Sequence, residues 1–326
     1  MRMKLSLRLL VSFLIAVAAT AIFAATAAAQ SASIQQGLTI SPFLLERQMQ
    51  KGDSTDEIID ITNTSSQVLP VIISINDFIP VGDNGQEEFV DPGQGDPHYS
   101  LSSWITITSD PKPILQPGEK TSIHFTITPP TNAEDGGHYG AILFTFKSGI
   151  LSGTGSEVIE KLGAIILVKL GKAVEDGQIA NFSTSHSFYQ YPPVSFNTRF
   201  KNTGNVHVAP RGNISIYNMF GTEVASVLVN ENANNVLANT ERAFASTWDT
   251  KFAFGPYRAS VKLVYGDSGS VVTASTTFWI LPWKTVLIYA FILLILILLF
   301  TNFLRRYNRW LLSKAYANKP VSKGKK

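Results

Sequence analysis

The sequence predicts an all-β protein that consists of two tandem β-sandwiches followed by one C-terminal transmembrane helix. Two observations carry this prediction. In the middle of the chain, short segments of alternating apolar and polar residues recur between turn-rich segments, which is typical of antiparallel sandwiches. Near the C-terminus, twenty consecutive residues carry no charge, and a helix of this length matches the roughly 30 Å hydrocarbon core of a bilayer.

The N-terminal segment has the features of a secretory signal peptide. Three basic residues precede a long apolar run that begins at Leu9, and Ala27 and Ala29 supply the small residues of a cleavage site. Residues 1–29 are therefore predicted to be removed after export. The chain has no cysteine, which excludes disulfides and an anchor on an acylated cysteine.

Three segments show the clearest strand periodicity, namely residues 123–128, 194–200 and 258–265. In each of them apolar side chains occupy every second position, so one face is expected to turn toward a core. The residues expected to face the cores are Ile123, Phe125, Ile127, Val194, Phe196, Phe200, Ala259, Val261, Leu263 and Tyr265.

The sandwich pattern occurs twice. An Asn-Thr pair ends a predicted strand at residues 63–64 and again at residues 202–203, and a turn and an apolar strand that reaches a proline follow each pair. A Gly-x-Tyr sequence lies downstream of each copy and ends at Tyr139 and at Tyr257. The repeated order of these features indicates two domains of the same kind.

The first copy is longer than the second. The separation from Asn to Tyr is 76 residues in the first and 55 in the second, and the polar stretch of residues 79–100 accounts for the difference. This stretch is expected to be a loop inserted into a first domain of residues 30–171, with a second domain over residues 172–283. The loop carries five carboxylates and no basic residue, so a calcium site is an alternative to a solvated loop, although the spacing matches no EF-hand.

A stretch that combines carboxylates, a histidine and glycines precedes Tyr139. In immunoglobulin-like sandwiches a tyrosine near the start of the sixth strand bonds back to the preceding corner. Asp135, Gly137 and Tyr139 have the spacing of such a corner, and Gly255 and Tyr257 repeat it in part. One histidine with two adjacent acids makes a poor metal set. The stretch is therefore predicted to be a structural corner of an immunoglobulin-like domain.

The strand after this corner is apolar on both faces. With Tyr139 and the residues two and four positions further on placed inside, the side chains of Ile142, Phe144 and Phe146 are expected to point outward. Strands that are apolar on both faces are usually covered on both faces. The cover is expected to be the second domain, the inserted loop or another protein, so these three residues form a candidate interface.

The sequence assembles no catalytic constellation. The Gly-Asp-Ser-Gly segment at residues 266–269 lies between two predicted strands, where a hairpin turn is expected rather than a nucleophile. The five histidines are scattered and show no ligand spacing. The chain is therefore expected to be no enzyme and to hold no cofactor or metal.

The C-terminal segment is predicted to hold the protein in the cell membrane. The transmembrane helix is expected over residues 284–304, and the tail of residues 305–326 carries eight basic residues and no acidic one. The positive-inside rule places this tail in the cytoplasm and both domains outside, in a single-pass arrangement. The residues expected at the two membrane interfaces are Trp279, Trp283, Arg305, Arg306, Arg309 and Trp310.

The exported part is acidic although the whole chain has a formal net charge of +3. Of the 27 basic residues, three lie in the signal peptide, eight in the tail and one, Lys284, at the membrane, whereas all 24 acidic residues lie in the exported part. The remaining 15 basic residues leave a net charge of −9. Such a surface does not attract nucleic acid.

Several motifs of the first domain, taken in order, resemble the WxL-interacting surface proteins of bacteria. Ser41-Pro42 lies near the first predicted strand, and an Asn-Thr turn, Pro117-Gly118-Glu119 and Gly137-His138-Tyr139 follow before the membrane span. The resemblance covers about residues 36–171 and the anchor. It implies a membrane-tethered immunoglobulin-like protein that binds peptidoglycan or a WxL-type surface protein. Similar motifs also occur in pilus-chaperone-like modules.

Two non-enzymatic functions agree with these features. The first is an extracellular binding or scaffold protein that engages cell-wall glycan or another surface protein. The alternative is a membrane-tethered chaperone or assembly factor that lends a strand edge to exported subunits. A basic cleft for the C-terminus of a subunit would favour the alternative, whereas the net charge of −10 over residues 30–171 speaks against it. An enzyme, the third class, would need a polar cluster that the sequence does not supply.

Overall fold

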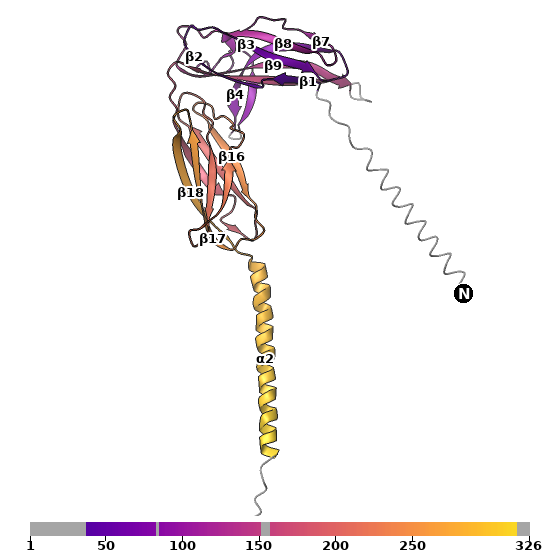
Figure 1. Cartoon of the computed structure of the whole chain (residues 1–326), viewed down its shortest axis with the longest axis vertical. Coiled ribbons are helices and arrows are strands. Elements are labelled where there is room, and N and C mark those ends of the chain that lie inside the picture. Colours follow the sequence, from indigo (N-terminus) through magenta and orange to yellow (C-terminus); the bar gives the residue numbers. More distant parts are fainter. Residues whose placement is uncertain (1–36, 83–84, 151–156, 318–326) are drawn as a thin grey trace, which may run out of the picture.

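A computed structural model of the chain describes residues 37–82, 85–150 and 157–317 (Figure 1). The predicted signal peptide and the end of the predicted tail lie outside the described residues. The described residues form two β-sandwiches, domain 1 and domain 2, and a C-terminal helix, α2 (Trp283–Ala317). The predicted fold class is confirmed.

Domain 1 packs a four-stranded sheet against a six-stranded sheet. The strand order is β1-β3-β8-β6 in the first and β2-β10-β9-β4-β5 in the second, where β7 also pairs with β4. Neighbours are antiparallel except for β2 and β10, which are parallel. A short 3-10 helix, η1, precedes β6. The elements are β1 (Leu38–Ser41), β2 (Leu44–Met49), β3 (Thr55–Asn63), β4 (Leu69–Val81), β5 (Gln86–Val90), η1 (Ser102–Trp104), β6 (Ile105–Ile107), β7 (Ile114–Leu115), β8 (Lys120–Ile127), β9 (Gly136–Ile150) and β10 (Glu157–Leu170).

Domain 2 packs a three-stranded sheet, β11-β13-β16, against a five-stranded sheet, β12-β18-β17-β14-β15. The last strand, β18, leads directly into α2. The strands are β11 (Gly177–Thr184), β12 (Phe188–Tyr189), β13 (Val194–Asn202), β14 (Arg211–Tyr217), β15 (Glu223–Val229), β16 (Glu241–Trp248), β17 (Gly255–Tyr265) and β18 (Ser270–Ile280).

The alternation of apolar and polar residues places each strand in its sandwich. All ten side chains that were predicted to face a core are buried. The three residues from β8 belong to the core of domain 1, and the seven from β13 and β17 belong to the core of domain 2. The Gly-Asp-Ser-Gly segment is the turn between β17 and β18, as predicted.

The stretch predicted as an inserted loop is only partly a loop. Residues 79–81 complete β4, and β5 pairs with that end of β4 in a hairpin, with Phe78 opposite Phe89. The expectation of a loop over residues 79–100 was therefore wrong in its first half. Side-chain composition concealed the hairpin, because β5 lies at an edge and exposes its carboxylates to solvent.

The register expected for β9 was wrong by one residue. Ile142, Phe144 and Phe146 lie in the core of domain 1, where Phe144 sits opposite Ile73 of β4. Tyr139 and the residues two and four positions further on face the other way. The sequence could not decide between these registers, because both alternating sets of β9 are apolar and a one-residue shift exchanges the two faces.

The two domains and the helix form an angular molecule (Figure 1). Domain 1 lies across the end of domain 2 that is remote from α2, and domain 2 and the helix follow one direction. The β4–β5 hairpin reaches from domain 1 toward domain 2. The long axis of domain 1 is thus roughly perpendicular to the direction shared by domain 2 and α2.

Candidate binding edge and domain junction

The outward face of β9 is covered by the junction between the domains. Tyr139, Ala141 and Leu143 pack with Leu167 of β10 against Leu237 and its neighbour in the loop before β16, and all of them are buried. A strand that is apolar on both faces was predicted to be covered on both faces, and this is confirmed. The cover comes from domain 2, from Phe78 of β4 and, through Tyr99, from the inserted segment.

Tyr139 belongs to this junction and does not form the predicted corner. Its hydroxyl accepts a hydrogen bond of 3.1 Å from the backbone N–H of Ala238 in domain 2. Gly137 lies directly beneath the hydroxyl, where any Cβ would clash with it. The Gly-x-Tyr spacing of domain 1 therefore serves domain docking. In domain 2 the hydroxyl of Tyr257 accepts a bond of 3.1 Å from the N–H of Phe254, three residues upstream, which is the geometry of a tyrosine corner.

Asp135 also bonds away from any corner. Its carboxylate lies 2.9 Å from Lys51 Nζ, and this ion pair lowers the pKa of the exposed Asp135 carboxyl. The next residues of the chain meet domain 2, because the N–H of Gly137 donates to the carbonyl of Asn205 at 2.7 Å. Asn205 is held in turn by Val174, whose N–H donates to the Asn205 side chain at 2.7 Å.

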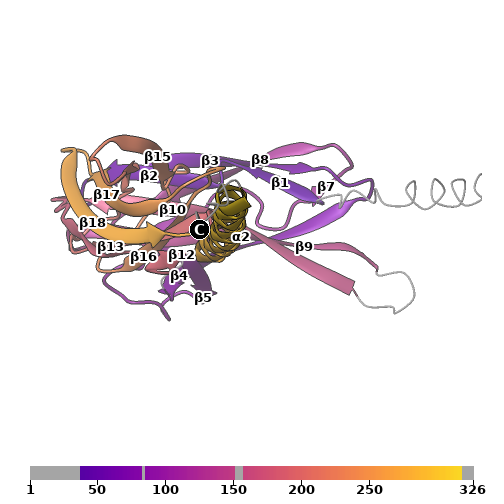
Figure 2. The same ribbon diagram turned by 90° about the horizontal axis from the view of Figure 1, so that it is seen from below.

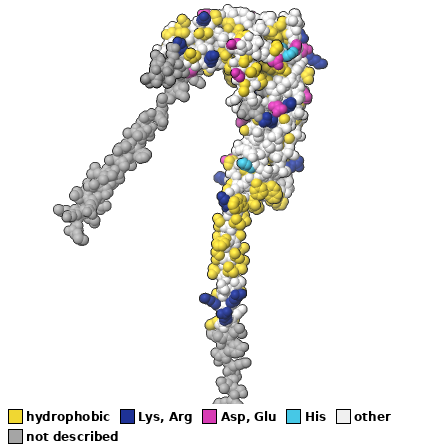
Figure 3. All heavy atoms as spheres, turned by 180° about the vertical axis from the view of Figure 1, so that it is seen from behind, with side chains coloured by type: hydrophobic (Ala, Val, Ile, Leu, Met, Phe, Trp, Pro, Cys, Tyr) yellow, Lys and Arg dark blue, Asp and Glu magenta, His cyan; other side chains and the backbone are white. Residues whose placement is uncertain are grey.

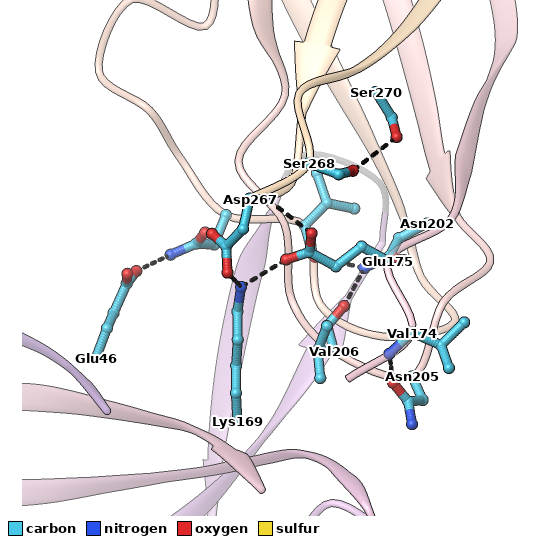
Figure 4. Close-up of polar contacts among 12 residues, drawn as sticks. Glu46, Lys169, Val174, Glu175, Asn202, Asn205, Val206, Asp267, Ser268 and Ser270 are labelled. Atoms are coloured by element: carbon cyan, nitrogen blue, oxygen red, sulfur yellow. Dashed lines mark hydrogen bonds and ion pairs between the residues drawn. The ribbon is translucent and has the colours of Figure 1, made fainter. Parts of the chain in front are cut away.

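An ion-pair network of three residues joins the end of β10, the segment between β10 and β11, and the turn between β17 and β18 (Figure 4). Lys169 Nζ lies 2.7 Å from Glu175 Oε1 and 3.6 Å from Asp267 Oδ2. The N–H of Asp267 donates to the second oxygen of Glu175 at 2.7 Å. Lys169 and Glu175 are largely buried, so their ion pair helps to hold the two domains in this orientation. The Lys169 ammonium is thereby already paired with the carboxylates of Glu175 and Asp267.

The inserted segment supports the junction from the side. Asp77, which is buried, accepts hydrogen bonds from the backbone of Gly93, Leu101 and Ser102 and from two serine hydroxyls. It thereby gathers the loop after β5 into a fixed shape. A cleft of about 320 Å³ remains between this loop and domain 2. Among the described residues, which do not include Asp83, no group of three or more His, Asp or Glu side chains is placed so that it could hold a metal ion.

Two buried histidines lie close to the junction. His207 is 2% exposed, and its Nδ1 has no hydrogen-bond partner among the described residues. Burial lowers the pKa of His207 to about 4. His138, which packs on Trp104 with ring centres 4.2 Å apart, is also buried, and burial lowers its pKa as well. Both imidazoles are therefore neutral at pH 7, and Nε2 of His138 lies 3.1 Å from the carbonyl oxygen of Glu134.

The free edge of β10 is the feature that sequence reasoning did not locate. β9 pairs with β10 over its whole length, whereas β2 pairs only with its second half, from Ile165 to Leu170. Among the described residues, the first half of β10, residues 157–164, therefore has a neighbour on one side alone. The residues that precede β2 in the sequence could have continued its pairing along this edge. They instead form β1, which pairs with β3 in the opposite sheet.

The backbone direction along this edge follows from one hydrogen bond. Ile165 donates its N–H to the carbonyl of Phe43 at 2.8 Å, so odd-numbered residues of β10 turn their N–H and C=O groups away from β9. Lys161 and Gly163 continue this parity toward the start of the strand. Their backbone groups consequently point toward the unoccupied side, where a further strand can pair. Ile159, 61% exposed, lies on the same edge.

The β9–β10 hairpin also reaches beyond its sandwich. The pairing of β4 with β9 ends at Phe146, whereas β9 continues to Ile150 and pairs there with the first residues of β10. Figure 2 shows this end of the hairpin standing apart from the strands of the opposite sheet. We call the projecting part, residues 147–150 and 157–161, the arm.

The helix α2 could span a membrane. Over Trp283–Leu311 its most apolar window has a mean hydropathy of 2.8 and none of it is buried. The helix continues past residue 304, where the predicted span ends, through Arg305, Arg306 and Arg309 to Ala317. Figure 3 shows the basic side chains gathered just below the apolar part. Trp283 is the first residue of α2, and the exposed Trp310 lies beside its basic end.

No protein-family model matches the chain, and no curated protein matches it. Among solved structures it is similar to the class 5 fimbrial chaperone CfaA, with 17% identity, a TM-score of 0.38 and coverage of 74% of this chain and 98% of that one. It is also similar to the Escherichia coli chaperone DraB (11%, TM-score 0.34, coverage 74% and 94%). A third is the CsuC–CsuE chaperone–tip subunit pre-assembly complex of Acinetobacter baumannii (14%, TM-score 0.34, coverage 73% and 97%).

With TM-scores below 0.4, these similarities carry no argument about function. The architecture of two immunoglobulin-like sandwiches is established by the strand pairing of the chain itself. The resemblance to WxL-interacting proteins finds no support in the comparisons.

Proposed function

We propose that this protein is a membrane-tethered assembly factor that binds exported polypeptides by strand addition to the free edge of β10. The observation that carries the proposal concerns the backbone of Lys161 and Gly163, which no described strand pairs on the side away from β9, whereas the second half of the same strand is paired with β2. An extended segment placed there would continue the six-stranded sheet in the direction of β2. Strand addition draws its affinity from main-chain hydrogen bonds and therefore accepts segments of varied sequence.

Other edges of domain 1 are less suited to this role. β6 and β7 have three and two residues, and β5 exposes the carboxylates of Glu87 and Glu88. The first half of β3, which β1 does not pair, carries the ion pair in which Arg47 bonds both carboxylate oxygens of Glu57. Short and charged edges resist pairing, whereas the edge of β10 is long and carries an exposed isoleucine.

The proposal differs from capture of a subunit's C-terminus in a basic cleft. Two cations near the junction are already balanced by carboxylates, because Lys169 forms an ion pair with Glu175 and Arg242 interacts electrostatically with Glu87. The similar structures include fimbrial chaperones, but the proposal depends on the edge and not on that similarity. Binding of cell-wall glycan or of a WxL-type protein, and the absence of catalysis, stay predictions.

The tether completes the proposal. α2 would cross the cell membrane with the basic residues in the cytoplasm and both domains outside, since basic flanks stay on the cytoplasmic side. Domain 2 would then separate the free edge of β10 from the membrane.

The edge can be tested by replacing one backbone donor. Lys161→Pro removes an N–H that points away from β9, so the hairpin should keep its internal pairing while strand addition is lost. Lys161→Ala, the matched control, removes the same side chain and keeps the N–H. A photo-crosslinking residue at Ile159 should capture a secreted protein in native membranes from the wild type and from Lys161→Ala, but not from Lys161→Pro.

Ile114 provides the control position for crosslinking. It has the same exposed fraction, 61%, and lies on β7 at the other edge of the same sheet. Equal capture from both positions, or capture that survives Lys161→Pro in a correctly folded variant, would show that the edge of β10 does not bind the partner.

A further inference from the structure

The end of domain 2 that adjoins α2 carries large apolar side chains on the tips of its loops. Three loops meet there, because the strand ends that they connect lie level with the end of β18. Phe220 is 84% exposed and Phe252 is 78% exposed. The six exposed loop side chains, which we call the apolar collar, are Phe188, Tyr191, Met219, Phe220, Phe252 and Phe254.

The opposite end of domain 2 packs against domain 1, where Leu237 is buried in the junction, and Val174, in the segment before β11, is the large apolar side chain that stays exposed beside it among the described residues. Within its described residues, the loops 203–210, 230–240 and 266–269 contain no large hydrophobic side chain that is exposed. Single exposed apolar residues are ordinary on soluble proteins, but a contiguous set at one end marks a contact surface. Figure 3 shows apolar side chains gathered over this end, next to the apolar helix.

The collar is held in place by the structure. The N–H groups of Phe220 and Thr222 both donate to the side chain of Asn218, at 2.9 and 3.1 Å, so the turn presents Phe220 outward in a fixed shape. Phe188 stacks on Trp279 with the ring planes 5° apart. Phe220 and Phe188 both stand exposed in this arrangement.

The start of α2 is fixed against the same loops. The N–H of Leu281 donates to the carbonyl of Tyr189 at 2.9 Å. The hydroxyl of Tyr191 lies 2.5 Å from that of Thr285 in the first turn of the helix. A membrane crossed by α2 would accordingly meet the collar, because the segment that carries Phe188 and Tyr191 is bonded to the residues where the helix leaves the domain.

We propose that the apolar collar inserts into the headgroup layer of the bilayer that α2 crosses, so that domain 2 is docked on the membrane and does not swing on its anchor. The inference rests on the proposed tether and goes beyond it, since a single span would hold the domain equally well at a distance. Tyrosine favours this interfacial layer, and the phenylalanine and methionine side chains of the collar gain free energy by leaving water. The docked domain would keep the arm parallel to the surface (Figure 1).

The absence of cysteine from the chain allows a direct test. The full-length protein is prepared with one nitroxide-labelled cysteine at a time and reconstituted in vesicles of phosphatidylcholine and phosphatidylglycerol. The positions are Phe220 and Phe252 in the collar, Ser268 in the exposed turn at the other end of domain 2, and Leu294 in the middle of α2. Collision rates with oxygen and with a water-soluble nickel chelate then report the depth of each label.

Labels at Phe220→Cys and Phe252→Cys should show a severalfold higher ratio of oxygen to nickel collisions than the label at Ser268→Cys. If they match Ser268→Cys while Leu294→Cys is buried in lipid, the tether holds and the collar proposal is overturned. If Leu294→Cys is itself accessible to the nickel chelate, α2 does not span the bilayer, and both the tether and the collar are overturned.

Discussion

Tyr139 and Tyr257 hold equivalent places in the Gly-x-Tyr pattern, yet their hydroxyl groups bond in different directions. Tyr257 bonds three residues back within its own domain, whereas Tyr139 bonds across to Ala238 of the other domain. The difference depends on what lies beyond the corner. Domain 1 has a second domain against its strand β9, so the tyrosine ring becomes part of an interface with Phe78 and His207.

The burial of His207 predicts that stability depends on pH. In the unfolded chain its pKa is near 6.5, and in the folded protein it is about 4. Between these values the unfolded chain binds a proton that the folded chain does not, so the free energy of unfolding should be highest above pH 6.5 and fall as the pH falls toward 4. The loss is of the order of 3 kcal/mol, because each pKa unit corresponds to about 1.4 kcal/mol.

Urea denaturation of the full-length protein in detergent micelles at pH 7.5, 5.5 and 4.5 measures this dependence. The charged groups Glu46, Lys169 and Asp267 also act on His207, so the comparison is made with His207→Gln, which retains them. The variant should lose less stability over the same range. His138 should preserve part of the slope, since burial lowers its pKa too. An identical slope in wild type and variant would contradict the assignment.

At the scale of the strand, β9 has two buried faces, and each of them packs in a different place. Its even-numbered residues from 142 to 146 fill the sandwich, and its odd-numbered residues from 139 to 143 fill the junction. Both sets have nearly the same exposed fraction. Their roles differ, because the first set is buried within one domain and the second is buried only while the two domains stay together.

Substitutions on the two sides should therefore fail in different ways. Phe144→Asp places an unpaired charge in the core and should unfold domain 1, since such a charge costs several kcal/mol. Leu237→Asp, in a loop of domain 2 that covers the other face, should separate the domains while both sandwiches stay folded. Hydrogen exchange would show loss of protection throughout domain 1 in the first variant and only around the junction in the second. Global unfolding by Leu237→Asp would mean that the junction is required for folding itself.

At the scale of the whole molecule, the position of both domains on the same side of α2 predicts which residues a protease can reach. If α2 crosses the membrane with its basic end inside, protease added to intact, wall-stripped cells should digest both domains. A protected fragment that contains α2 should remain, detectable by an antibody against the last residues of the chain. Protection of residues 37–281 would place the domains inside and exclude the proposed function.

The sequence by itself determined the local properties of this protein. The alternation in β8, β13 and β17 identified strands and their buried faces, because a half-buried strand exposes every second side chain. The uncharged run of α2 and its basic end are equally local, since a span needs only length and composition. The repeated Asn-Thr and Gly-x-Tyr patterns indicated two similar domains for the same reason.

Only the tertiary structure decided what depends on neighbours from distant parts of the chain. The register of β9 followed from which domain covers each of its two apolar faces, and the inserted segment became a hairpin because β4 extends to meet β5. The free edge of β10 exists because the residues that precede β2 pair as β1 in the opposite sheet, so no local pattern in Glu157–Leu170 could reveal it. The collar is likewise formed from three loops that are far apart in sequence, and their shared position at one end of a sandwich is a property of topology alone.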